Sequence, residues 1–253
     1  MGGHWTIFLS DAKAALQVWR RFPVLPAITL GISLMQGFAY LNWAAIVVAI
    51  FVGIYWFGWV GTERVIYLRG FRGLSITSGE AWRMTRKFWG RYFWTGAIVF
   101  VPFLVILFPV SAAFGTSLGE TEEVWGAAIS VGLATLVLDV FLTFATPALA
   151  FTTHEPISAI KIGWMMLREG WPATAWYAVL PPMAFVAITY SQPPATSNRW
   201  AWVLAACVAA LLNLLAKGAV AAFYLREHPE VGDEGAAFAD QVAPTDPPSK
   251  LEE

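Results

Sequence analysis

The sequence predicts an all-α membrane protein with six transmembrane helices, built as three repeats of an amphipathic cytoplasmic helix followed by a transmembrane hairpin. Three observations predict this class. The 253 residues are 58% hydrophobic and only 13% charged, whereas soluble domains are about 25% charged. The chain holds 14 Trp, a residue that gathers where a membrane meets water. Long apolar runs also alternate with short basic segments.

The apolar runs give the expected spans. A span requires roughly twenty mainly apolar residues, because the hydrocarbon core is about 30 Å thick and a helix rises about 1.5 Å per residue. We expect spans at residues 22–41, 43–60, 92–114, 124–151, 173–190 and 200–224. Prolines inside the spans favour kinks, which either shape a cavity or belong to a static bundle. They are Pro102, Pro109, Pro147, Pro181 and Pro182.

The positions of the basic residues predict the orientation. Cytoplasmic segments of membrane proteins carry an excess of Lys and Arg. Loops 41–43, 115–124 and 191–199 hold one basic residue, Arg199, and three acids. Twelve basic residues instead lie in the segments before the first, third and fifth spans. We therefore expect both termini in the cytoplasm, in a bacterial cytoplasmic (inner) membrane. The basic residues are Lys13, Arg20, Arg21, Arg64, Arg69, Arg72, Arg83, Arg86, Lys87, Arg91, Lys161 and Arg168.

The segment before each odd-numbered span repeats one pattern. Each has apolar residues at helical spacing, and each ends in an aromatic residue followed by a turn residue. These pairs, Phe22-Pro23, Trp89-Gly90 and Trp171-Pro172, predict turns into the bilayer. The pattern divides the membrane domain, residues 1–226, into units of about 5–70, 75–152 and 155–226. The alternative is convergence, since any interfacial helix is amphipathic.

The second of these segments is the most basic. Thr77 or Ser78 is expected to cap a helix on which Arg83, Arg86, Lys87 and Arg91 form one stripe, opposite Trp82, Met84, Phe88, Trp89 and Tyr92. Such a helix is typical of the inner headgroup layer, where each basic residue gains about 1 kcal/mol against anionic lipid. The four basic residues are therefore the candidate contacts to anionic lipid.

The last residues differ in composition from the rest. Residues 227–253 are acidic, rich in proline and poor in large apolar side chains. Such a segment buries too little surface to offset the entropy of ordering it. We expect a disordered cytoplasmic tail, with a docking tail as the alternative.

Charged residues within the expected spans identify a candidate polar site, because burial of charge in a membrane is costly and marks function or pairing. The site comprises Asp139, Thr143, Asn213 and Lys217. Asp139 is either a proton, cation or ligand site or a buried anchor that pairs with Lys217 or another span. Lys217 alternatively extends its stem toward the cytoplasmic headgroups. We expect Glu63 and Arg64, at the end of the second span, to be interfacial.

The sequence contains no recognisable catalytic or metal-binding motif. The three histidines lie in separate segments, and the single cysteine, Cys207, falls within the last span. Neither a zinc-protease motif, a phosphate loop nor a nucleophile elbow occurs. The net charge of −1 provides no general basic field for nucleic acid. We expect no catalytic residue, no metal, no cofactor and no nucleic-acid partner.

Three segments carry a resemblance to known families: "ALQVWRRFPVL", "AWRMTRKFWGRYFW" and "AIKIGWMMLREGWP", each followed by a predicted hairpin of spans. Residues 5–225 resemble the six-helix membrane domain attached to some bacterial glycerophosphodiester phosphodiesterases, and related YciC-type uncharacterised inner-membrane families. The resemblance implies a membrane-domain protein without established chemistry. It transfers no catalytic residue to this chain.

Three functions agree with these observations. The first is a non-enzymatic accessory, scaffold or assembly subunit that organises protein partners or lipids. Its partners would be anionic headgroups at the cytoplasmic face and a larger membrane protein complex. The alternative is a small proton-coupled transporter that uses Asp139 and Lys217. The third is a membrane enzyme or lipid-handling protein that draws headgroups to the basic residues.

Overall fold

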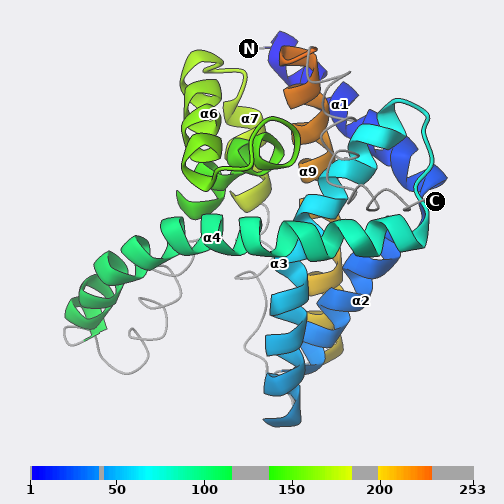
Figure 1. Cartoon of the computed structure of the whole chain (residues 1–253). Coiled ribbons are helices and arrows are strands. Elements are labelled where there is room, and N and C mark those ends of the chain that lie inside the picture. Colours follow the sequence, from blue (N-terminus) through cyan, green and yellow to red (C-terminus); the bar gives the residue numbers. More distant parts are fainter. Residues whose placement is uncertain (1, 40–42, 116–136, 184–198, 230–253) are drawn as a thin grey trace, which may run out of the picture.

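The computed structural model describes residues 2–39, 43–115, 137–183 and 199–229 (Figure 1). All regular secondary structure in these ranges is helical, which confirms the all-α expectation. The helices are α1 (Gly2–Arg21), α2 (Val24–Ala39), α3 (Trp43–Phe71), α4 (Ser78–Gly115), α6 (Pro156–Glu169), α7 (Ala175–Ala178) and α9 (Arg199–Glu227). A further apolar helix spans Val137–Phe151.

One helix among the described residues, at Val203–Glu227, is long and apolar enough to cross a membrane by length and composition. The helix at Val137–Phe151 is apolar but shorter. The expected spans at residues 124–151 and 173–190 lie partly outside the described residues. So do most of the predicted external loops and the acidic tail from residue 230 onward.

Helices α2, α3 and α9 pack side by side, and α1 covers one end of α3 and α9 (Figure 1). Helix α3 continues beyond residue 60, where the second span is expected to end, as far as Phe71. Its extra turns bury Val65, Tyr67 and Leu68 against α1 and α9. The core therefore extends past the apolar run and encloses polar positions of the same helix.

Helix α4 crosses α3 at a steep angle (Figure 1) and contacts it extensively. Two glycines of α3 allow this approach, because a Cβ on Gly58 would lie 2.3 Å from the carbonyl oxygen of Thr85, and one on Gly61 would lie 2.4 Å from the ring of Phe88. The hydroxyls of Thr62 and Thr85 meet at 2.8 Å. Small residues that let helix backbones approach are typical of packing between membrane helices.

A capping box begins α4. The Thr77 backbone N–H and hydroxyl donate to Glu80 Oε2 at 2.8 and 2.9 Å, and the Glu80 N–H donates to Thr77 Oγ1 at 3.3 Å. This confirms Thr77 as the cap of the predicted helix. The Thr77 N–H, its hydroxyl and Arg69 hold the pKa of Glu80 below its ordinary value. The carboxylate therefore stabilises the fold above its unfolded pKa, and this contribution is lost as the pH falls through the lower, folded pKa.

The turn expected at Trp89-Gly90 is wrong, because α4 runs unbroken through both residues. The expected turns at Pro23 and Pro172 are present: α1 ends at Arg21, and α6 ends at Glu169. The physical difference lies in the backbone. Proline lacks the N–H that continues a helix, whereas glycine keeps it and only lowers helix propensity.

Gly90→Ala is expected to raise stability by about 1 kcal/mol, the difference in helix propensity between the two residues. A Cβ at Gly90 meets nothing within 4 Å, so no clash opposes the gain. The measurement is the free energy of unfolding of the purified chain in detergent. A loss of stability would contradict a continuous α4 and favour a turn.

Candidate functional site

Two charged residues of α3 lie in the interior. Glu63 is 0% exposed and Arg64 is 2% exposed, so the expectation that they are interfacial is wrong. The reason is that α3 does not end near residue 60 but continues beneath α1 and α9. Charges at such positions are stable only when they are paired and hydrogen-bonded.

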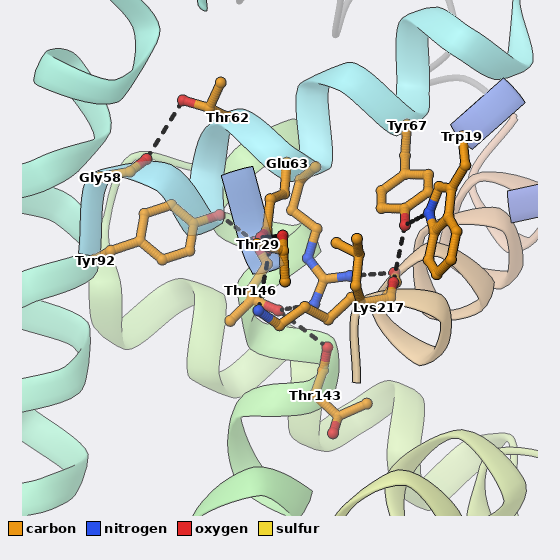
Figure 2. A network of polar contacts seen from close by, with 12 residues as sticks. Trp19, Thr29, Gly58, Thr62, Glu63, Tyr67, Tyr92, Thr143, Thr146 and Lys217 are labelled. Carbon is orange, nitrogen blue, oxygen red and sulfur yellow. Dashed lines mark hydrogen bonds and ion pairs between the residues drawn. The ribbon is translucent and has the colours of Figure 1, made fainter. Parts of the chain in front are cut away.

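Lys217 of α9 supplies the partner for Glu63. Its Nζ lies 3.1 Å from Glu63 Oε2 and 4.4 Å from the centre of the Trp56 ring. The Thr29 hydroxyl of α2 donates to Glu63 Oε1 at 3.5 Å (Figure 2). Lys217 therefore points to an internal carboxylate and does not extend toward the headgroups. This ion pair joins α3 to α9.

Arg64 joins the same network through neutral acceptors. Its Nη1 donates to the Lys217 carbonyl oxygen, and its Nη2 donates to Thr146 Oγ1 at 2.7 Å. The Tyr92 hydroxyl of α4 donates to the Thr146 carbonyl oxygen at 2.7 Å (Figure 2). In the described part of the chain, Arg64 Nε has no hydrogen-bond partner. Glu63, Arg64 and Lys217 together carry a net charge of +1.

Aromatic side chains close the network on the side of α1. Trp19 Nε1 donates to the Tyr67 hydroxyl at 2.7 Å, and that hydroxyl donates to the Leu214 carbonyl oxygen at 2.8 Å (Figure 2). Gly218 permits this contact, since a Cβ there would lie 2.5 Å from the Tyr67 ring. The three helices α1, α3 and α9 are thus locked together beside the ion pair.

A cavity of about 220 Å³ adjoins this network. All four residues of the candidate polar site, Asp139, Thr143, Asn213 and Lys217, line it. They come from the Val137–Phe151 helix and from α9, which are distant in the sequence. The wall also includes Arg64, Tyr92, Trp56, Phe57, Pro181 and Pro182. The volume corresponds to about seven water molecules at about 30 Å³ each.

Asp139, like Arg64, is a charged residue of the cavity wall that forms no ion pair with a described residue. Its backbone carbonyl accepts the Thr143 hydroxyl at 2.5 Å. Its carboxylate has no hydrogen bond or ion pair with another described residue. The sequence offered Lys217 as a partner, but Lys217 binds Glu63 instead. The carboxylate is left facing the cavity.

A second cluster of polar and charged side chains lies beside the cavity, with Asp11 buried and Arg226 exposed. The Tyr177 hydroxyl donates to Asp11 Oδ2 at 2.6 Å, and Arg226 Nη1 donates to Asp11 Oδ1 at 2.8 Å. This clamp ties α7 and α9 to α1 and has no net charge. Its carboxylate and guanidinium are occupied by each other, so the clamp contributes structure and offers no counter-charge to Asp139.

The basic stripe of α4 does not join the cavity. Arg83 and Arg86 are exposed, and Lys87 and Arg91 are half-buried. The Arg91 guanidinium lies 5.7 Å from the centre of the Phe88 ring. The stripe is a surface separate from the cavity.

Sequence reasoning missed Glu63 and Arg64 as members of the site. A signal was present, since the pair lies between the apolar residues Trp59-Val60 and Val65–Leu68. Charge flanked by apolar residues on both sides within one helix indicates burial more than an interface. The described residues hold no group of three or more His, Cys, Asp or Glu side chains placed to bind a metal.

Searches against family models, curated proteins and solved structures found no match to this chain. The resemblance to the phosphodiesterase-linked and YciC-type membrane families stays a prediction.

Proposed function

We propose that the chain is a multi-pass protein of the bacterial cytoplasmic membrane that binds a small polar solute in the cavity and moves it across the membrane. The carrying observation is the Asp139 carboxylate, which lines the cavity without a partner in a largely apolar helical chain. An ionisable group inside a membrane lowers stability, so its presence there marks a functional site. This favours the transporter among the three functions considered, with Asp139 as the proton or solute site and Lys217 in the same wall.

One feature of α3 and one of its contact with α4 support a membrane setting for the chain. Large apolar side chains project from the first half of α3, where Ile50 is 58% and Phe51 is 70% exposed. Lipid would cover them, whereas water would not. Helix α4 also crosses α3 near residues 58–62, where the apolar run of the second span is predicted to end. The exposed Arg83 and Arg86 would then lie in the inner headgroup layer, in contact with anionic lipid.

Asp139→Asn is expected to reduce uptake to the rate of empty liposomes, because the amide neither accepts a proton nor balances a positive charge at neutral pH. The measurement is uptake of a panel of labelled amino acids, amines and phosphate esters into proteoliposomes under an imposed pH gradient. Glu155→Gln is the matched control, since Glu155 is exposed and its glutamine replacement can still accept the Ser158 hydroxyl. Unchanged uptake by the Asp139 variant would contradict the proposal.

An accessory role remains the second candidate, because exposed apolar side chains also suit partner helices. Examples are Val105 and Leu204, which are 68% and 67% exposed. Purification from native membranes at low detergent tests this role: a stoichiometric membrane partner supports it, and the isolated chain contradicts it. In both candidates the role that we propose is non-enzymatic.

A further inference from the structure

The charged side chains in and beside the cavity sum to zero. Glu63, Arg64 and Lys217 leave one positive charge, and Asp139 supplies one negative charge. The clamp of Asp11 and Arg226 adds none. Asp139 and Lys217 line the same cavity, yet they form no ion pair because Lys217 is held by Glu63. An electrically neutral cavity thus presents separate positive and negative groups.

We propose that the ligand of this cavity is a small zwitterion, with an ammonium group that binds Asp139 and an anionic carboxylate or phosphate that binds Lys217 and Arg64. The inference rests on the proposed function and names its substrate class. A simple cation would meet Asp139 but would be repelled by two basic residues. A simple anion would be repelled by Asp139. A zwitterion satisfies both ends at once, as electrostatic complementarity requires.

The donors and acceptors left unused agree with such a ligand. The Lys217 ammonium has three N–H donors, and its side chain makes one hydrogen bond, to Glu63. The remaining N–H donors of Lys217 can donate to an anionic oxygen of a ligand. Asn213 also lines the cavity, and an amide oxygen can accept a hydrogen bond from an ammonium group.

The shape of the cavity limits the ligand to a small one. Trp56 and Phe57 give it aromatic walls, and Pro181 and Pro182 line it as well. A volume near 220 Å³ holds an amino acid or a phosphoethanolamine group. The same chemistry has two sources, a free solute or the headgroup of a zwitterionic lipid.

The test is isothermal titration of the full chain in phosphatidylglycerol nanodiscs with alanine, phosphoethanolamine, ethanolamine and inorganic phosphate. At least one of the two zwitterions is expected to bind about tenfold or more tightly than ethanolamine or phosphate, since each lost charge contact costs about a factor of ten or more. Asp139→Asn should remove this preference. Asp139→Glu, which keeps the charge, should retain part of it, and Glu155→Gln should retain all of it.

The proposal is overturned if neither zwitterion binds, if ethanolamine or phosphate binds as tightly, or if a folded Asp139→Asn chain keeps the preference. Repeating the titration in phosphatidylethanolamine nanodiscs distinguishes the sources. Loss of the phosphoethanolamine signal there supports a lipid headgroup as the natural ligand, and its persistence supports a free solute. If a zwitterion binds but uptake does not depend on Asp139, the proposed transport function is contradicted and the ligand class is not. If uptake depends on Asp139 but the solute is not a zwitterion, the proposed ligand class is contradicted and the transport function is not.

Discussion

Glu63→Leu is expected to destabilise the protein by about 3–5 kcal/mol, the usual effect of removing one partner from a buried ion pair. Glu63 is fully buried and holds Lys217 at 3.1 Å. Without its carboxylate, Lys217 would lose its ion-pair partner in the interior, and the positive charges of Lys217 and Arg64 would exceed the negative charge of Asp139 by one. The measurement is the free energy of unfolding of the purified chain in mixed micelles.

A double-mutant cycle separates the ion pair from general loss of packing. Lys217→Met in the Glu63→Leu background removes the orphaned charge, so the double variant should recover much of the lost stability. Glu227→Gln is the control, because its pair with Arg226 is exposed and 3.9 Å long, and it should change stability by less than about 0.5 kcal/mol. A Glu63→Leu variant no less stable than this control would contradict the buried pair.

Gly58→Ala and Gly53→Ala are expected to have opposite effects. At Gly58 the added Cβ would lie 2.3 Å from the Thr85 carbonyl oxygen, and such overpacking costs about 1–3 kcal/mol. At Gly53, on the same helix, a Cβ meets nothing within 4 Å, so the substitution should gain about 1 kcal/mol of helix propensity. Unfolding measurements on both variants check the contact of α3 with α4. Equal shifts of the same sign would show that α4 does not cross α3 at Gly58.

Local features of this fold were readable from the sequence. Apolar runs predicted helices, Thr77 was one of two residues expected to cap a helix, and prolines predicted the turns at Pro23 and Pro172. The turn predicted at Trp89-Gly90 was wrong because Gly90 was interpreted by analogy with those prolines. Glycine permits a turn, but nothing in its backbone imposes one.

Pairing across the chain was not readable in the same way. The rule that charge inside a span is costly located Asp139 and Lys217, and both line the cavity. It did not indicate that Lys217 binds Glu63, 154 positions away. Apolar residues on both sides of Glu63 indicate that it is buried, but a single sequence does not show which helices cover it. In the structure, α1 and α9 cover this part of α3.

In the proposed membrane setting, a polar cavity lies between helices whose outer faces meet lipid. Thiol labelling in nanodiscs, in a Cys207→Ser background, distinguishes the wall of the cavity from the outer faces. Asn213 lines the cavity, whereas its neighbour Leu212 is 42% exposed on the outer surface of α9. A small charged methanethiosulfonate reagent is expected to modify Asn213→Cys and to leave Leu212→Cys unreacted, because the reagent and the thiolate both require water. Reaction at Leu212→Cys with an inert Asn213→Cys would contradict both the cavity and the membrane setting.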